Sequence, residues 1–495
     1  MLSLSNTNEN SLKLSTPVVL LTLIFITLIR IYALFISPIE LSVDEAQYWH
    51  WSQNLDFGYF TKPPLIAWII GLSTNIFGNE EWAVRLFSPI IHFLIALILW
   101  ITTQFAFGLK AGRIAALLWI FTPAASLGSF IISTDTPLLL FWSLALLFIF
   151  KTFEDDTYIS ASFAGASLGL AFLSKYAALY FFVLLILWWI IYDKGKELTL
   201  KKLLLVLISS FVVATPNLYW NYSNDFVTAN HTISNANLSE IIINYKNVID
   251  FLSSQLLVFG PIIFLLYLFI ILNSFFKDQR LSLLGMLSLP IIILIIVQSF
   301  LKIANPNWAV TAYISATLMI SAYAIIQKHK VLRLFTKFGL FINFVLSLLI
   351  VKITLTGNFY PIHLKSDPLR KNLGFEILST EIKKTFDNNK ISKLVFINRG
   401  EITRFNYYLN KIDNKFKNKI FLKTQSMSPG NFYEQNYNYD KINHKRDEKI
   451  MIINRNLNIG NNFTNLTEIK FVRKIFTNTI KEHKRTYYLF EGKVK

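Results

Sequence analysis

The chain has 495 residues, 53% of them hydrophobic and 15% aromatic, and long apolar runs with short polar gaps over its first 350 positions exclude an ordinary soluble globular protein. It contains no cysteine, which excludes disulfides, thiolate metal sites and a cysteine nucleophile. The formal net charge is +18, and most of the excess positive charge lies after residue 354. A biased amino-acid composition explains this basic tail as well as binding to an anionic lipid or glycan does. We expect no nucleic-acid partner.

The apolar runs predict the membrane spans. A helix needs about 20 mostly apolar residues to cross roughly 30 Å of hydrocarbon. By that rule we expect about eleven spans, near residues 16–37, 84–106, 112–132, 136–153, 160–174, 177–193, 203–219, 253–275, 282–301, 309–327 and 332–353. The first run contains Arg30 and lacks a small-residue cleavage site, which favours a retained helix over a removed signal peptide.

Charges in the connections predict the orientation, because Lys and Arg in short loops favour the cytoplasmic side. With the N-terminus inside, every cytoplasmic connection is basic, through Lys110, Arg113, Lys151, Lys194, Lys196, Lys201, Lys202, Lys277, Arg280, Lys328, Lys330 and Arg333. The opposite loops and residues 354–495 would then lie outside the cytoplasm.

The first outer loop, residues 38–80, is too aromatic for an idle linker. Its Ser42 and Glu45 have the spacing of a capping box, so we expect a short helix along the membrane surface over about residues 43–53. Capping alone could explain Glu45. It does not explain Asp44, a carboxylate beside the hydrocarbon, where charge is costly.

Lys62 follows in the same loop and precedes two prolines. Successive prolines remove two backbone donors and hold the preceding residue extended, which would fix this lysine above the membrane. A lysine that snorkels at a membrane boundary is an equally good explanation.

Other polar residues fall at the outer ends of the predicted spans, and each has an ordinary structural alternative. Lys175 and Lys302 could be charged helix ends, and Asp135 could belong to the cap of the helix that follows. The indoles of Trp220 and Trp308 suit interfacial anchoring as well as sugar packing. We expect His231, a lone histidine in a long loop, to be a solvated surface group.

The tail contains alternating apolar patterns at residues 393–398 and 449–454, which predict strands, and a helical pattern near residues 373–386. We therefore expect a transmembrane domain over residues 1–353 and a small soluble α/β domain over 354–495. That domain would recognise an acceptor or cover the site from water.

The ordered motifs along the chain resemble a known family. They are Asp44-Glu45-Ala46, Tyr59-Phe60-Thr61-Lys62-Pro63-Pro64-Leu65, Val84-Arg85-Leu86, Thr134-Asp135-Thr136-Pro137-Leu138, Leu173-Ser174-Lys175-Tyr176, Pro216-Asn217-Leu218-Tyr219-Trp220-Asn221, Asn305-Pro306-Asn307-Trp308, and Asp367-Pro368-Leu369-Arg370 with Gly374. Together they resemble the protein O-mannosyltransferase superfamily, and more closely the bacterial family-39-like membrane glycosyltransferases that include the lipid A aminoarabinose transferase.

The resemblance implies a GT-C fold with about 11–13 transmembrane helices and a polyprenyl-phosphate sugar donor of the undecaprenyl type. It implies transfer to a lipid, glycan or protein at the periplasmic face of the bacterial inner membrane. Asp44 corresponds to the family's candidate base, with Asp135 near it, and Lys62 to the family lysine. The aminoarabinose branch commonly has an acidic metal-binding residue before that lysine, whereas this chain has Thr61. This difference disfavours a metal site at that position and an aminoarabinose substrate. We therefore assign no metal ligand and no cofactor, and a divalent metal stays an open alternative.

Sugar transfer from a lipid phosphate needs a base, cations for the departing phosphate and groups that orient the sugar. The candidates for the catalytic carboxylates are Asp44, Glu45 and Asp135. The candidates for the phosphate are Lys62, Arg85, Lys175 and Lys302. The candidates for the sugar or acceptor are Tyr59, Trp220, Asn221, Asn305 and Trp308. Direct displacement would invert the anomeric centre.

Two other classes of protein fit parts of the pattern. A transporter or flippase of lipid-linked sugars would also have many spans, but transporters usually have paired half-repeats around a midplane site. A membrane scaffold with a basic tail would leave the first outer loop unexplained. The gathering of polar candidates at one surface favours the enzyme.

Overall fold

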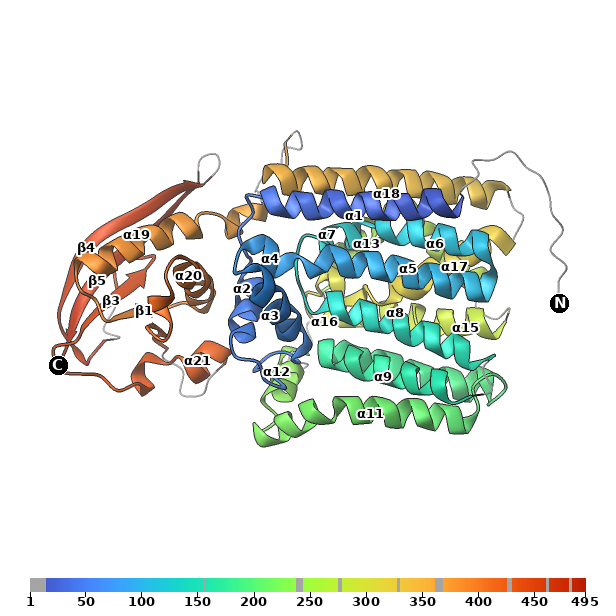
Figure 1. Cartoon of the computed structure of the whole chain (residues 1–495), viewed down its shortest axis with the longest axis horizontal. Coiled ribbons are helices and arrows are strands. Elements are labelled where there is room, and N and C mark those ends of the chain that lie inside the picture. Colours follow the sequence, from blue (N-terminus) through green and yellow to red (C-terminus); the bar gives the residue numbers. More distant parts are fainter. Residues whose placement is uncertain are drawn as a thin grey trace.

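The computed structural model describes residues 15–154, 157–236, 244–274, 278–326, 330–360, 368–424, 430–459, 463–479 and 483–495. Residues 1–14, Lys277, Lys328 and Asp367, which the sequence analysis used, lie outside the described residues. A long bundle of helices carries a small α/β domain at one end, and segments of the first outer loop lie between the two (Figure 1).

The bundle is helical at each apolar run that the sequence predicts as a span. Its helices are α1 (Thr16–Ile36), α5 (Phe87–Phe107), α6 (Leu109–Phe121), α7 (Pro123–Gly128), α8 (Asp135–Thr152), α9 (Ile159–Ser174), α10 (Leu179–Trp188), α11 (Leu200–Ser223), α13 (Tyr245–Phe259), α14 (Pro261–Ser274), α15 (Gln279–Met286), α16 (Leu289–Leu301), α17 (Ala312–Ile326) and α18 (Lys330–Thr356). Short turns η1 (Tyr176–Ala178), η2 (Trp189–Asp193) and η3 (Pro306–Ala309) adjoin them.

The number of spans is lower than predicted when helices are judged by length and composition. Among the described residues seven helices are long and apolar enough to cross a membrane, or eight if the pair α13 and α14, bent by 105°, is one span. The difference lies in shorter apolar helices such as α9 and α17, and in α6, which ends just before Pro123. These helices still run alongside the longer ones (Figure 1).

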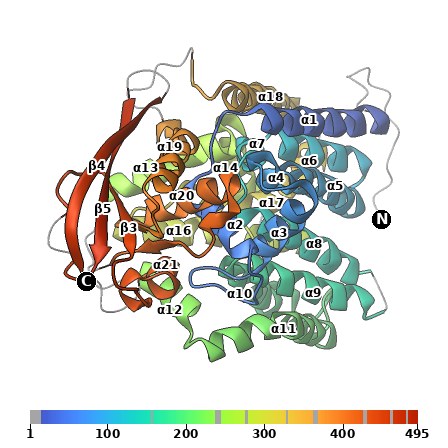
Figure 2. The same ribbon diagram turned by 60° about the vertical axis from the view of Figure 1, so that its left-hand side comes forward.

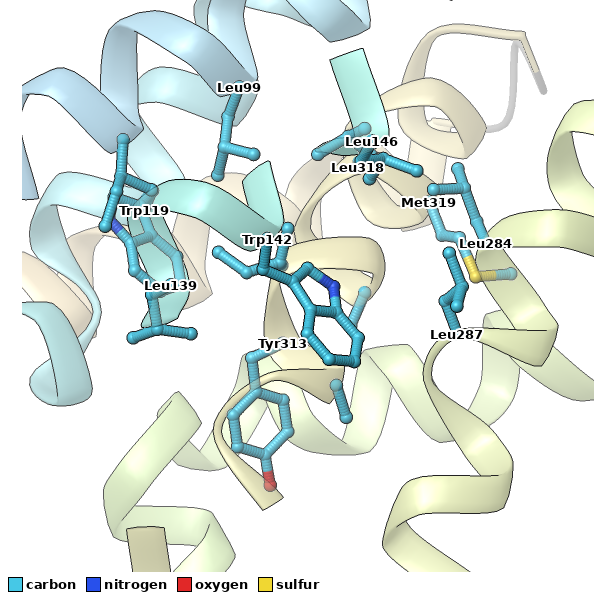
Figure 3. Close-up of a cluster of buried hydrophobic side chains, with 14 of the residues drawn as sticks. Leu99, Trp119, Leu139, Trp142, Leu146, Leu284, Leu287, Tyr313, Leu318 and Met319 are labelled. Carbon is cyan, nitrogen blue, oxygen red and sulfur yellow. The ribbon is translucent and has the colours of Figure 1, made fainter. Parts of the chain in front are cut away.

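The bundle core is a continuous apolar cluster in which large rings fill the space between helices. Trp119 of α6, Trp142 of α8 and Tyr313 of α17 are all buried there, among leucines of the neighbouring helices (Figure 3). In hydrocarbon the hydrophobic effect does not drive helices together, so the van der Waals packing of these rings stabilises the bundle. This packing holds the helix ends, and thus the outer loops, in fixed positions.

Arg30 lies inside the bundle and ties α1 to its neighbours. Its side chain is fully buried and donates hydrogen bonds to the Ile120 carbonyl (2.6 Å) and to the hydroxyls of Ser126 (2.8 Å), Ser129 (3.1 Å) and Ser347 (3.2 Å). Neutral acceptors of this kind reduce the large cost of a cation at membrane depth.

Short helices of the first outer loop lie between the bundle and the α/β domain. They are α2 (Val43–Ser52), α3 (Leu65–Phe77) and α4 (Glu81–Arg85), and α12 (Val227–Ala236) lies near them (Figure 1). The predicted helix over residues 43–53 and its capping box are confirmed, because the Ser42 hydroxyl accepts from the Glu45 amide and the Glu45 carboxylate accepts from the Ser42 amide.

The α/β domain has a five-stranded sheet in the order β2 (Ile420–Leu422), β1 (Lys393–Phe396), β3 (Lys449–Asn454), β5 (His483–Val494) and β4 (Leu466–Thr479). Strand β1 is parallel to β2 and β3, whereas β5 is antiparallel to β3 and β4. The helices and turns are η4 (Pro368–Asn372), α19 (Phe375–Asn388), α20 (Arg399–Ile412), η5 (Asn414–Phe416), α21 (Phe432–Asn436) and η6 (Tyr439–Lys441). The two predicted strands and the helix are confirmed.

The α/β domain packs on the first outer loop through helix α20, which lies beside α2 (Figure 2). Trp49 of α2 and Tyr407 of α20 make an edge-to-face contact at 4.9 Å and belong to one buried cluster. The Tyr408 hydroxyl accepts from the Leu41 amide at 2.8 Å. This shared core fixes the domain relative to the loop.

Candidate functional site

A cavity of about 160 Å³ lies where the first outer loop, α12 and the α/β domain meet. Its lining residues are Asp44, Gln47 and Tyr48 of α2, Thr61 and Lys62 of the loop after α2, His231 of α12, and Arg399 of α20. Segments far apart in the sequence therefore share one hollow.

Asp44 is placed in the cavity by the start of α2. The capping box fixes the first turn of that helix, and the carboxylate of Asp44 remains exposed. In the part of the chain that the structure describes, no hydrogen bond or ion pair involves this carboxylate. It is therefore available to accept a proton from a bound hydroxyl.

Lys62 is fixed by a tight turn. Its carbonyl accepts a hydrogen bond from the Tyr59 amide at 3.1 Å, and the Tyr59 carbonyl accepts one from the Thr228 hydroxyl at 2.6 Å. No carboxylate among the described residues forms an ion pair with the Lys62 ammonium. The ammonium thus faces the cavity without a bound counter-ion.

The charges around Lys62 place the other candidates close to it. Burial lowers the pKa of Lys62; the positive charges of Lys175 and Arg399 lower it further, and the carboxylates of Asp44 and Asp135 act in the opposite direction. An ammonium that is poorly hydrated in this way gains more than usual from a bound anion.

Asp135 lies at the start of α8, and its two oxygens are occupied. One accepts from the Lys175 ammonium at 2.7 Å and the other from the Asn307 amide at 2.7 Å. Burial raises the pKa of the Tyr48 hydroxyl, and Asp44 and Asp135 raise it further. Both carboxylates thus act on the same two cavity residues, Lys62 and Tyr48. The convergence of Asp44 and Asp135 on one bound sugar phosphate stays a prediction.

Glu45 and Arg85 do not line the cavity. They form an ion pair at 2.7 Å, with only 1% of the Glu45 side chain and 4% of the Arg85 side chain exposed. The Glu45 carboxylate also accepts from the amides of Ser42 (2.9 Å) and Ile132 (3.2 Å). This arrangement favours the capping interpretation of Glu45 over a catalytic one, and the Arg85 guanidinium is bound to Glu45 and to the carbonyls of Ile39 and Glu40.

Tyr59 shapes the loop rather than the cavity wall. Its ring stacks on Trp51 at 4.8 Å, and its hydroxyl donates to backbone carbonyls near the end of α2. Trp220 packs so closely on Gly58 that an added Cβ would come within 2.3 Å of the indole. The Asn221 amide donates to the Tyr176 hydroxyl at 2.9 Å.

Three other predicted residues follow α16 and are not among the cavity-lining residues. Lys302 follows the last residue of α16 and is exposed, and Asn305 is exposed just before η3. Trp308 packs against the bundle core. In the predicted Asn-Pro-Asn-Trp motif it is Asn307 that contacts Asp135.

Arg399 was not predicted as a site residue, and the prediction that His231 is solvent-exposed is wrong. Arg399 begins a helix that follows a strand, and nothing in its local pattern indicates that this helix docks over Asp44. His231 is half-buried on the cavity, with its ring 5.8 Å from that of Phe60, and is not a solvated surface group. Burial lowers the pKa of His231, and the charges of Lys62 and Arg399 lower it further, so the ring is neutral near pH 7.

The residues around Lys62 do not fit a metal ion. Thr61 lines the cavity at the position where the aminoarabinose branch has an acidic residue. Within the described ranges no group of three or more His, Asp or Glu side chains is placed to hold a metal.

Comparisons with known proteins agree with this fold. The family model described as dolichyl-phosphate-mannose-protein mannosyltransferase matches residues 61–220. A lipid A galacturonosyltransferase of Rhizobium johnstonii is 36% identical over 338 residues, which are 67% of this chain and 69% of that protein. The crystal structure of ArnT from Cupriavidus metallidurans bound to undecaprenyl phosphate superimposes with a TM-score of 0.66 at 12% identity, over 96% of this chain and 98% of that chain. Its apo structure gives a TM-score of 0.65 at 12% identity, over 95% and 97% of the two chains.

The fold and the site together define a membrane glycosyltransferase with the GT-C architecture. The chain belongs to the family of bacterial membrane glycosyltransferases in the protein O-mannosyltransferase superfamily that includes this lipid A galacturonosyltransferase. The predicted family and fold class are therefore confirmed, and the interpretation as a transporter or scaffold is set aside.

Proposed function

We propose that the protein transfers a sugar from an undecaprenyl-phosphate type of donor to lipid A or a related lipid, at the periplasmic face of the inner membrane. The observation that carries this proposal is that Asp44 and Lys62 line one cavity and that, among the described residues, neither has an ion-pair partner. The relative that is 36% identical is a lipid A galacturonosyltransferase, and a protein of the same fold was solved with undecaprenyl phosphate.

In the proposed reaction the oxygen of an acceptor hydroxyl bonds to the anomeric carbon while the bond from that carbon to the phosphate oxygen breaks. Asp44 takes the hydroxyl proton as general base. The electron pair of the broken bond remains on the polyprenyl phosphate, and Lys62 stabilises the added negative charge. Attack opposite the leaving phosphate inverts the anomeric centre.

Other residues of the site act by position. We propose that Asp135 holds Lys175 near the phosphate, since their ion pair is only partly exposed, at 12% and 19% of the two side chains. Glu45 and Arg85 would hold α2, and thus Asp44, in place. Tyr59, Trp220 and Asn221 would hold the loop that carries Lys62.

We propose that Lys302, Asn305 and Trp308 contact the parts of the donor or acceptor that extend past the cavity. All three follow α16 at the outer end of the bundle.

The proposed orientation rests on the two ends of the bundle. Helix α1 starts at the end opposite the α/β domain (Figure 1), where the Arg113 guanidinium donates to the Thr16 hydroxyl at 2.6 Å. The basic connections belong to that end, which we assign to the cytoplasm. The cavity and the α/β domain would then face the periplasm.

The test uses the full-length protein in nanodiscs with a polyprenyl-phosphate sugar and lipid A, and the product is detected by mass spectrometry. Asp44→Asn should fold normally and lower the rate about 10²–10⁴-fold, because the general base is lost. Glu468→Asn, a change at an exposed residue of the α/β domain, should retain the wild-type rate. Full activity of Asp44→Asn would remove Asp44 from the mechanism, and NMR of the product would test inversion.

A further inference from the structure

Arg399 brings a second cationic group to the cavity from the α/β domain. It is the first residue of α20, the helix that packs on α2, and its Nη2 donates to the Oε1 of Gln47 at 2.6 Å. Its Nε is buried and has no hydrogen-bond partner. In the described part of the chain no carboxylate forms an ion pair with this guanidinium.

The charges of the cavity leave Arg399 without an assigned role. Lys62 and Arg399 are the cationic lining residues, His231 is neutral near pH 7, and Asp44 supplies the one carboxylate among the lining residues. The proposed reaction uses Lys62 for the donor phosphate and needs Asp44 as a base. A partly buried guanidinium without a counter-ion is costly unless a ligand supplies an anion.

The geometry points to a subsite in which Arg399 binds an anionic group of the transferred sugar. We take this group to be the carboxylate of a uronic acid, because the 36% identical relative is a lipid A galacturonosyltransferase. The inference rests on the proposed function, since it assumes a polyprenyl-phosphate sugar as donor. A guanidinium presents a planar fork of donors that matches a carboxylate. Gln47 holds one nitrogen of this fork, and the unpartnered Nε remains for the ligand.

The position of Arg399 suits a group on the sugar itself. Lys62 and Arg399 line the same small cavity and are close enough for Arg399 to lower the pKa of Lys62. One sugar phosphate that carries a carboxylate would place an anion on each. An acceptor phosphate has related chemistry, and the test separates the two sources.

The test compares two donors that differ only in the sugar, a uronic acid and the corresponding neutral hexose on the same polyprenyl phosphate. With Arg399→Gln, kcat/KM for the uronic acid donor should fall about 10- to 100-fold, the loss expected for a charged hydrogen bond. Transfer of the neutral sugar should change much less. Arg446→Gln, a change at an exposed arginine of the same domain, is the matched control.

A second pair of assays uses acceptors with and without phosphate. An equal loss with both donors that disappears with the dephosphorylated acceptor would assign Arg399 to the acceptor and overturn the proposal. Unchanged transfer of the uronic acid by Arg399→Gln would also overturn it. If the wild-type protein transfers sugar from neither donor, the proposed function fails instead.

Thermal unfolding of the variants checks their fold. If Arg399→Gln unfolds early, Gln47→Leu provides a second variant, because it releases the guanidinium without removing it. Gln47→Leu should give a smaller loss with the same preference for the uronic acid donor. An equal effect on both donors would contradict the proposal.

Discussion

The ion pair of Glu45 with Arg85 offers the sharpest test of how the loop is held. In Glu45→Gln the neutral amide leaves the buried Arg85 guanidinium without its negative partner. The amide oxygen and the carbonyls of Ile39 (2.8 Å) and Glu40 (3.0 Å) can still accept hydrogen bonds, but none of them carries a charge. Removal of one member of a buried pair costs about 3–5 kcal/mol. That is a large part of the 5–15 kcal/mol that stabilises a typical protein.

The assay is thermal or denaturant unfolding of the purified protein in detergent. The rate of sugar transfer is measured on the same preparations. Glu45→Gln should unfold earlier by an amount that corresponds to about 3–5 kcal/mol. Glu468→Gln is the matched control because its side chain is 58% exposed and contacts only Lys470, at 3.4 Å, among the described residues. The control should change the free energy of unfolding by less than about 0.5 kcal/mol.

A double variant separates the pair from its surroundings. Glu45→Leu combined with Arg85→Met should recover much of the stability, because the unpaired buried charge is removed. The reasoning would be refuted by a Glu45→Gln protein that has wild-type stability and no transfer activity. Such a protein would assign Glu45 to the chemistry.

Two further predictions concern Lys62 and His50. Lys62→Gln should lower the single-turnover rate constant of sugar transfer about 10²–10³-fold, because the leaving phosphate loses its cation. Lys470→Gln, a change at an exposed lysine, should leave that rate constant unchanged. If Lys62→Gln transfers sugar as fast as the wild type, Lys62 does not have this role. Burial lowers the pKa of His50 to about 4, and its ring contacts Tyr437 at 2.8 Å and Asn406. The unfolded chain, with a pKa near 6.5, therefore takes up the proton first as pH falls, and stability is lost from pH 6.5 to 4, by about 3 kcal/mol in all. The difference in Tm between wild type and His50→Gln should shrink over that range, and a constant difference would disprove the effect.

Local patterns predicted the parts of the site that depend on short stretches of chain. The capping box predicted α2, the prolines predicted a fixed Lys62, and alternation predicted β1 and β3. Asp135 was a candidate because of its place at the end of a predicted span, and the family resemblance placed it near Asp44. Each of these features is set by neighbouring residues, so the sequence states it directly.

Contacts between distant segments could not be predicted in the same way. Arg399 reaches the cavity because α20 docks on α2, and the two helices are separated by more than three hundred residues. Glu45 pairs with Arg85, which lies forty residues away in the sequence. In the sequence, each of the two charged residues is therefore a candidate for a catalytic or binding role. In the Asn305-Pro306-Asn307-Trp308 motif, the turn that begins at Pro306 places Asn307 and not Asn305 against Asp135. The sequence motif alone does not distinguish the two asparagines.

The anchoring of the cavity walls suggests how this fold divides chemistry from specificity. Asp44 and Lys62 belong to one loop, which is held to the bundle by the Glu45 ion pair and by the turn at Tyr59. Arg399 belongs to the α/β domain, which shares its core with α2 and so cannot leave without disturbing that helix. Substitutions on the cavity side of α20 should therefore change which anionic group is bound, while Asp44, the proposed base, and Lys62, the proposed phosphate ligand, stay in place.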